Sequence, residues 1–252
     1  MELFNLSGKR ALVVGGGGDL GFAMMEGLLE AGASAVAVDI DPNVSSLTDL
    51  LSKKGFKASS LQVDITDRSA IKKSVADAEK LLNGSIDILV NSAGIQRRRP
   101  SEDYLEKDWD DVISINLTAT FFYCQLVAKN MILNGYGKII NVASIMSFFG
   151  GVTIPAYAAS KGGVAQLTKA LSNDWASKGI CVNAIAPGYI DTRLNTALIN
   201  DDERSTEVLL RTPMKRWGIP NDMKGVAIFL SSPASDFISG AVLPIDGGYS
   251  AR

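Results

Sequence analysis

The chain has 252 residues, and 46% of them are hydrophobic, which is enough to bury a large core. Its 25 Lys and Arg residues are balanced by 27 Asp and Glu residues, so neither nucleic acid nor an anionic membrane is an expected partner. It contains no histidine, which excludes a Ser-His-Asp triad and a Cys/His metal cluster, and we expect no metal.

Short apolar runs alternate with longer helical patterns along the whole chain. Most of these runs are continuous, which is typical of strands covered on both faces, and they predict strands at 10–14, 34–39, 58–64, 86–91, 137–144, 180–187 and 241–246. Glycines mark the expected helix ends at Gly32, Gly84 and Gly179. The alternation indicates right-handed βαβ units. The predicted fold is α/β, a single doubly wound (Rossmann-type) domain over residues 1–252, with a mostly parallel seven-stranded sheet and helices on both faces.

The longest irregular region runs from about 189 to 219 and contains Pro213. A long loop in a compact domain is often a lid over a site, and a few helical turns would fit this region equally well. If it is a lid, it covers the substrate.

Targeting signals are not evident in this sequence. The start, MELFNLSGKR, lacks a basic stretch followed by an apolar run, so we expect no secretory signal. We also find no apolar run near the ~18 residues that a membrane span needs. Cys124 and Cys181 lie in apolar stretches, as expected of reduced thiols in a cytoplasmic protein rather than of a disulfide.

The first predicted strand leads into a glycine-rich loop, "VVGGGGDLG" at 13–21, which opens a helical pattern. Glycines let backbone N–H groups approach a pyrophosphate at a helix start, although four in a row also suit an ordinary flexible turn. Asp39 ends the second predicted strand, near the ~20-residue offset at which a carboxylate binds an adenosine ribose; alone, it would equally be a solvated strand end. Together the two features favour a dinucleotide site.

The same carboxylate bears on the choice of cofactor. Asp39 would accept hydrogen bonds from ribose hydroxyls but would repel the extra phosphate of NADP. No Lys or Arg lies between Gly15 and Gly21. The expected cofactor is therefore NAD.

A candidate catalytic group follows the fifth predicted strand. Tyr157 and Lys161 are one helical turn apart, on one helix face, and Ser144 ends the strand at the sheet edge where open α/β folds bind ligands. A nearby ammonium favours the phenolate, so such a tyrosine could exchange a proton with an alcohol or carbonyl without histidine. Taken alone, a Tyr and a Lys at this spacing are usually incidental.

Several motifs, taken in order, resemble the short-chain dehydrogenase/reductase family over the whole chain. "VVGGGGDLG" stands where the family has Thr-Gly-x-x-x-Gly-x-Gly, and "NSAG" at 91–94 resembles its Asn-Asn-Ala-Gly. Ser144 with "YAASK" at 157–161 matches its Ser and Tyr-x-x-x-Lys, and "PGYIDT" at 187–192 matches its Pro-Gly turn and following Thr. Asn116, in "SINLTATF", falls where the family places the helix Asn of its catalytic tetrad.

The resemblance implies a role for each matching residue. Tyr157 would be the general acid/base, and Lys161 would lower its pKa and hold the nicotinamide ribose. Ser144 would orient the reacting oxygen, and Asn116 would support a water-linked proton path to Lys161. The implied cofactor contacts are Gly15, Gly17, Gly18, Asp19, Leu20, Gly21, Asp39, Ile40, Asp64, Ile65, Asn91, Ala93, Gly94, Tyr157, Lys161, Pro187, Gly188, Ile190 and Thr192. Asp64 and Ile65 would flank the adenine, and Ile190 and Thr192 would hold the carboxamide.

Three residues depart from the family pattern. Val14 and Ser92 replace residues that brace the loop, and Asp19 replaces a glycine. Because Asp is a favoured N-cap residue, we expect Asp19 to cap the helix and to point away from the pyrophosphate. Its charge would still weaken NAD binding somewhat.

Further segments resemble the branch of the family that acts on sugar acids of the 2-deoxy-D-gluconate and gluconate type; they are "KDWDDV", "SFFGG", "KRWGIPND" and "DGGYSAR". Such substrates carry a carboxylate, which an Arg can clamp bidentately. Arg98, in the run that follows the fourth strand, is the first candidate, although this run would equally be a solvated basic loop. Gln96, Met146 and Arg193 are further candidates, and Met146 is also explained as packing.

The predicted activity is NAD-dependent hydride transfer at a secondary alcohol or ketone of a sugar acid. The resemblance also implies a homo-oligomer, and members of the family are usually tetramers. One rival is a reductase of another ketone, such as a 3-oxoacyl thioester or a polyol-derived ketone, since one fold serves many substrates. Another is a nucleotide-binding scaffold without turnover, which the three departures suggest and the intact tetrad opposes.

Overall fold

Seven parallel strands form one sheet in the computed structural model, which describes residues 2–252. The strands are β1 Arg10–Val14, β2 Ser34–Asp39, β3 Ala58–Gln62, β4 Ile88–Asn91, β5 Gly137–Val142, β6 Ile180–Pro187 and β7 Val242–Ile245. Their order is β3-β2-β1-β4-β5-β6-β7, and every pair is parallel. The predicted fold class is confirmed, and each predicted strand exists within two residues of its expected ends.

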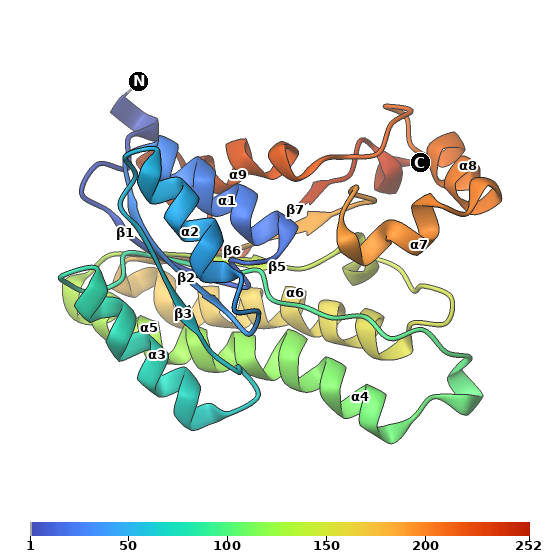
Figure 1. The fold of residues 1–252 in the computed structure, drawn as a ribbon, viewed down its shortest axis with the longest axis horizontal. Coiled ribbons are helices and arrows are strands. Elements are labelled where there is room, and N and C mark those ends of the chain that lie inside the picture. The colour runs from blue at the N-terminus through green and yellow to red at the C-terminus, as the bar shows by residue number, and fades with distance from the viewer. Residues whose placement is uncertain (1) are drawn as a thin grey trace.

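Helices cover both faces of this sheet (Figure 1). One face packs against α1 Asp19–Glu30, α2 Val44–Lys53 and α9 Lys224–Ser231. The other packs against α3 Arg68–Leu81, α5 Ala119–Asn134 and α6 Pro155–Trp175. Each layer closes over its own apolar cluster, because the central strands bury side chains on both faces. This two-sided core fixes the strand ends that carry the polar residues.

The strand order reverses between β1 and β4, and this reversal places the site. Val14 pairs with Asn91 at the carboxyl ends of the two strands. The chain leaves β1 toward β2 on one side and leaves β4 toward β5 on the other side. These opposite connections leave a crevice at the sheet edge, where doubly wound folds bind ligands. Gly15 has φ +78°, and a Cβ there would lie 2.5 Å from the Ala93 nitrogen. The glycine loop and segment 92–94 therefore meet backbone to backbone.

The region 189–219 is largely helical rather than irregular. It contains α7 Thr196–Ile199 and α8 Asp202–Arg211, and an isolated bridge joins Ile190 to Gly218 at its base. Figure 1 shows both helices in orange, beyond the carboxyl end of the sheet. The helical turns that the sequence left open as an alternative are thus present.

A long helix departs from the sequence expectation about membrane spans. α4 Glu106–Ile113, a π-helical turn Ser114–Thr118 and α5 form one helix of 29 residues, which is long and apolar enough to cross a membrane by length and composition. The expectation considered only uninterrupted apolar runs and therefore did not single out this helix. α5 buries Tyr123, Val127 and Met131 in the core, which accounts for its composition.

Both cysteines are free, as predicted. Cys124 is buried, and burial raises the pKa of its thiol to about 12, so it is not nucleophilic near neutral pH. Cys181 is partly exposed.

Candidate active site

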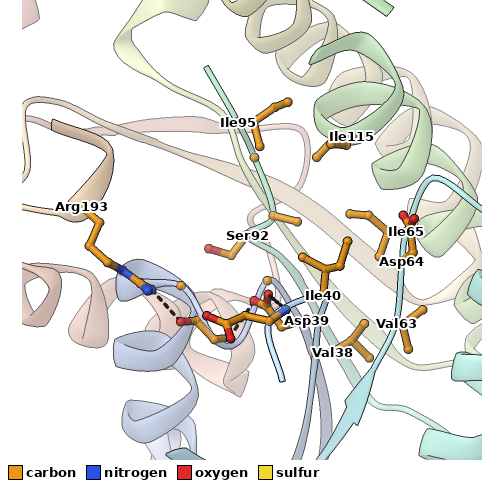
Figure 2. Close-up of a pocket in the computed structure, with 16 residues that line it drawn as sticks. Val38, Asp39, Ile40, Val63, Asp64, Ile65, Ser92, Ile95, Ile115 and Arg193 are labelled. Carbon is orange, nitrogen blue, oxygen red and sulfur yellow. Dashed lines mark hydrogen bonds between the residues drawn. The ribbon is translucent and has the colours of Figure 1, made fainter. Parts of the chain in front are cut away.

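The glycine loop forms one wall of a cavity of about 290 Å³, here called the glycine-loop cavity (Figure 2). Asp39 lies against this loop. Its Oδ2 accepts a hydrogen bond from the Gly17 nitrogen at 2.9 Å, and its Oδ1 accepts one from the Asp41 nitrogen at 3.0 Å. A Cβ on Gly17 would lie 3.0 Å from the carboxyl carbon of Asp39. The carboxylate is therefore built into the cavity wall and is not a solvated strand end.

Nine of the nineteen predicted cofactor residues line the same cavity. They are Gly15, Gly17, Gly18, Asp39, Ile40, Asp64, Ile65, Ala93 and Gly94. Figure 2 shows Val38, Ile40 and Ile65 around an apolar hollow, with Asp39 beside it. Apolar side chains suit a base, and a carboxylate suits a ribose diol. The N–H groups of Gly15 to Gly18 all donate within the protein, so the backbone donors that remain for phosphate are those of the first turn of α1. With these donors the cavity fits a dinucleotide.

A second cavity, of about 120 Å³, holds the candidate catalytic group and is here called the catalytic cavity. Ser144, Tyr157 and Lys161 all line it, and Ser92 and Gly94 line both cavities. Ser144 follows β5 at the sheet edge, whereas Tyr157 and Lys161 lie one turn apart on α6. The fold thus brings together residues from two elements and places them next to the glycine-loop cavity.

A backbone hydrogen bond holds the Lys161 ammonium close to the Tyr157 ring. Its ammonium donates to the Val142 carbonyl at 2.6 Å and lies 5.7 Å from the centroid of the Tyr157 ring. The lysine is buried, and burial lowers its pKa to about 8. It can therefore change protonation state close to physiological pH.

Burial and two neighbouring residues affect the pKa of Tyr157. Burial raises the pKa of this phenol, while a hydrogen bond with Ser144 and the positive charge of Arg98 act in the opposite direction. The net effect is a pKa above the ordinary value of a tyrosine, and Ser144 and Arg98 reduce the free-energy cost of forming the phenolate.

Asn116 braces the junction between the two cavities. Its Oδ1 accepts from the Ile95 nitrogen at 2.8 Å, and its Nδ2 donates to the Ile95 carbonyl at 3.0 Å and to Ser160 Oγ at 3.1 Å. It lies in the π-helical turn that joins α4 to α5, and such turns are frequent at functional sites. A Cβ on Gly94 would lie within 3.5 Å of both Lys161 Nζ and Asn116 Oδ1, so the three are adjacent.

The predicted substrate residues divide into two groups. Gln96, Arg98 and Met146 line the catalytic cavity. With its amide oxygen toward Arg98, Gln96 accepts from Nε at 3.0 Å and from Nη2 at 2.9 Å. Desolvation and the like charge of Arg204 lower the pKa of Arg98, and within residues 2–252 no carboxylate figures among the charges that act on it. Among the described residues, Arg98 is therefore a cation without a carboxylate partner.

Arg193 does not lie in that cavity. Its side chain reaches the glycine loop, where Nε donates to Asp19 Oδ1 at 3.1 Å and Nη2 donates to the Gly17 carbonyl at 2.8 Å. Its backbone nitrogen also donates to Asp19 Oδ2 at 2.8 Å. The structure thus places the Arg193 guanidinium at the glycine loop and not in the catalytic cavity, where the sequence had suggested it.

Two further expectations were wrong. Asp19 does not cap α1: Gly18 is the N-cap residue, and the Asp19 carboxylate is taken up by Arg193. Asn91 does not line the groove, since it is buried and its Nδ2 donates to Asn141 Oδ1 at 2.9 Å and to Cys124 Sγ. The strand alternation turns this side chain into the core, while Ser92 faces the cavities.

The remaining predicted residues, Leu20, Pro187, Gly188, Ile190 and Thr192, line the catalytic cavity. Gly21 serves packing, since a Cβ there would lie against the Gly15 carbonyl. The sequence analysis missed further lining residues, among them Ile154, Tyr189, Leu194 and Asn195. Tyr189 lies inside the "PGYIDT" motif, and that position was the available signal. Leu194 and Asn195 line the cavity because 189–219 folds back over the sheet edge, whereas Ile154 immediately precedes α6.

Comparison with known proteins gives consistent matches over the whole chain. A family model described as enoyl-(acyl carrier protein) reductase matches residues 18–250. The chain is 45% identical over 252 residues to 2-dehydro-3-deoxy-D-gluconate 5-dehydrogenase of Bacillus subtilis (strain 168), covering 100% of this chain and 98% of that protein. A solved structure from Agrobacterium tumefaciens, described as a 2-deoxy-D-gluconate 3-dehydrogenase with bound NADP, has a TM-score of 0.93, 46% identity and 100% coverage of both chains. A gluconate 5-dehydrogenase from Burkholderia cenocepacia J2315, in complex with NADP and tartrate, has a TM-score of 0.96 and 41% identity, over 100% of this chain and 98% of that one.

Proposed function

This chain belongs to the short-chain dehydrogenase/reductase family, and we propose that it interconverts a secondary alcohol and a ketone on a sugar acid. The observation that carries the proposal is Arg98, a cation that has no carboxylate partner within residues 2–252 and lines the same cavity as Ser144 and Tyr157. A substrate carboxylate would supply the missing partner bidentately. The names of the relatives, a 2-dehydro-3-deoxy-D-gluconate 5-dehydrogenase and a gluconate 5-dehydrogenase, support this substrate class.

The proposed mechanism needs no metal and no histidine. A bound nicotinamide supplies the hydride acceptor or donor. Tyr157 takes the hydroxyl proton during oxidation and returns it during reduction, and Ser144 holds the reacting oxygen by a hydrogen bond. Lys161 favours the phenolate electrostatically and holds the nicotinamide ribose, and Asn116 supports a water-linked proton path to it. In this role Asn116 also keeps the 94–95 backbone against α6.

We further propose that NAD is preferred over NADP. Asp39 supports this preference, because its carboxylate lines the glycine-loop cavity and would repel a ribose phosphate. Two similar solved structures hold NADP, so the preference must be measured on this chain. Asp39→Ser combined with Ile40→Arg removes the repulsion and adds a phosphate partner, and the ratio of kcat/KM for NAD over NADP should then fall at least tenfold. A wild-type enzyme with a higher kcat/KM for NADP would overturn the preference.

Three further proposals accompany this function. Segment 189–219 acts as a substrate lid, since Tyr189, Leu194 and Asn195 wall the catalytic cavity. The protein is cytoplasmic, and it assembles as a homo-oligomer. A tetramer is the form proposed, because members of the family are usually tetramers.

A substrate panel tests the function directly. Gluconate, 2-deoxy-D-gluconate, their keto acids, neutral polyols and a 3-oxoacyl thioester would be offered with NAD or NADH, and NADH absorbance would be followed. We expect turnover of sugar acids to exceed that of the neutral polyols of equal length. A preference for the thioester or for a polyol would favour the rival ketone reductase, and NADH binding without any turnover would favour the non-catalytic scaffold.

A further inference from the structure

The ion pair between Asp19 and Arg193 joins the glycine loop to segment 189–219 where the two cavities meet. Arg193 lies between Thr192 and Leu194, which line the catalytic cavity, yet its own side chain lines the glycine-loop cavity. It thus straddles the junction of the two cavities. Figure 2 shows the side chain extending from the 189–219 segment to the glycine loop next to Asp39.

A dinucleotide that fills both cavities has its diphosphate at this junction. Its adenosine would lie by Asp39 and its nicotinamide by Tyr157, so the linking phosphates pass between the glycine loop and Arg193. An unneutralised Asp19 would oppose two phosphate charges at this point. The structure pairs that carboxylate with a guanidinium instead, through Arg193 Nε to Asp19 Oδ1 at 3.1 Å.

Part of the Arg193 guanidinium is not engaged by the described residues 2–252. Nε and Nη2 of Arg193 are used by Asp19 and by the Gly17 carbonyl, whereas within residues 2–252 Nη1 makes no hydrogen bond. The side chain is 66% exposed, so this edge is accessible. An arginine fork held by one edge can bind phosphate with the other.

We propose that Arg193 is a ligand of the cofactor diphosphate and that Asp19 positions it. This proposal rests on the proposed use of a nicotinamide dinucleotide. Asp19 fixes both the backbone nitrogen and the side chain of Arg193, so that the guanidinium is oriented before the cofactor binds. The aspartate that stands in place of a loop glycine is then part of the cofactor site, through a residue far along the chain.

A double-mutant cycle tests the pair by calorimetric titration with NADH. In Arg193→Ala the guanidinium is lost and Asp19 faces the phosphates alone, so the Kd for NADH should rise about tenfold or more. In Asp19→Ala the lost orientation and the freed positive charge oppose one another, so the Kd should stay within about threefold of wild type. Adding Arg193→Ala to Asp19→Ala should then raise the Kd only about threefold.

Matched probes separate the diphosphate from the rest of the cofactor. Arg193→Ala should weaken ADP-ribose, NADH and NADPH by the same factor and leave adenosine unaffected. It should also flatten the salt dependence of NADH binding. Arg216→Ala breaks a comparable ion pair with Asp222, at 2.7 Å, in the same 189–219 region and its border, and should change the Kd for NADH less than twofold.

Several results would overturn the proposal. They are an NADH affinity of Arg193→Ala within twofold of wild type, an equal loss for adenosine, or an equal cost of Arg193→Ala with and without Asp19. A much larger loss for NADPH than for NADH would show that Arg193 reads the extra phosphate instead. Failure to turn over any sugar acid would overturn the proposed substrate class and leave this binding cycle intact, whereas a wild-type protein that binds no dinucleotide would overturn both.

Discussion

The catalytic cavity and the glycine-loop cavity are neighbours, but they are held together by different forces. In the first, Ser144 and Lys161 are buried, and Lys161 is anchored by a backbone carbonyl at 2.6 Å. In the second, the bridge that crosses the groove is an exposed ion pair, with side chains 66% and 29% accessible. Buried anchors are weakly screened and change protonation equilibria strongly, whereas an exposed pair is screened by water and salt. We therefore expect the first region to set the rate and the second to tune cofactor affinity.

The sharpest test of this division is Tyr157→Phe. The ring still packs, but no hydroxyl is left to carry the proton, so kcat should fall by about 10²–10⁴. The Kd for NADH, measured by titration, should stay within about twofold. Activity within a factor of two of wild type would remove Tyr157 from the mechanism, and a large loss of NADH binding would show that the two cavities are not separable.

Removing the unpaired cation should have the next largest effect. Arg98→Met keeps an unbranched apolar stem but removes the charged guanidinium, and kcat/KM for a sugar acid should fall by about 10–10². The value for a neutral polyol of equal length should change little, and this substrate is the internal control. An equal loss for both substrates would assign Arg98 to packing or to tuning of Tyr157 rather than to a substrate carboxylate.

A smaller effect is expected from Ser144→Ala on the pH profile. Oxidation needs the phenolate of Tyr157, so its kcat/KM rises with pH, while reduction needs the phenol and its rate falls with rising pH. The hydrogen bond from Ser144 lowers the pKa of Tyr157, so its removal raises that pKa. Both limbs should move to higher pH, besides any loss of rate.

The control for this experiment is Ser147→Ala, at a nearby serine whose hydroxyl donates to the Lys161 carbonyl at 2.7 Å. It should leave the limbs in place. Because Tyr157 and Lys161 titrate as neighbours, the measured values belong to the pair. Unmoved limbs in Ser144→Ala would exclude the hydrogen bond as a determinant of the tyrosine pKa.

The sequence predicted these two regions unequally, for physical reasons. The strands were found because buried parallel strands are continuous apolar runs. Ser144, Tyr157 and Lys161 were found because they lie close together in the chain and their motif resembles that of the family. The partner of Asp19 is 174 residues away in the chain, and no local pattern signals such a pair. Asn91 was misplaced for a related reason, since a shift of one residue in a strand reverses the face on which its side chain lies.

The smallest expected effect concerns the stability of the exposed bridge. Asp19→Ala removes one surface ion pair, which contributes less than about 1 kcal/mol to the free energy of unfolding. For a chain of this size, that corresponds to a fall in the melting temperature of at most about 2–4 °C, and high salt should reduce it. Arg193→Ala and the double variant should melt close to Asp19→Ala, because all three lack the ion pair and differ only in the hydrogen bonds from the Arg193 nitrogen to Asp19 and from its guanidinium to the Gly17 carbonyl. A fall of more than about 5 °C, or additive losses in the double variant, would mean that Asp19 stabilises α1 independently of Arg193. The glycine loop would then owe its shape to the aspartate itself, and cofactor affinity could not be tuned at this edge without cost to the fold.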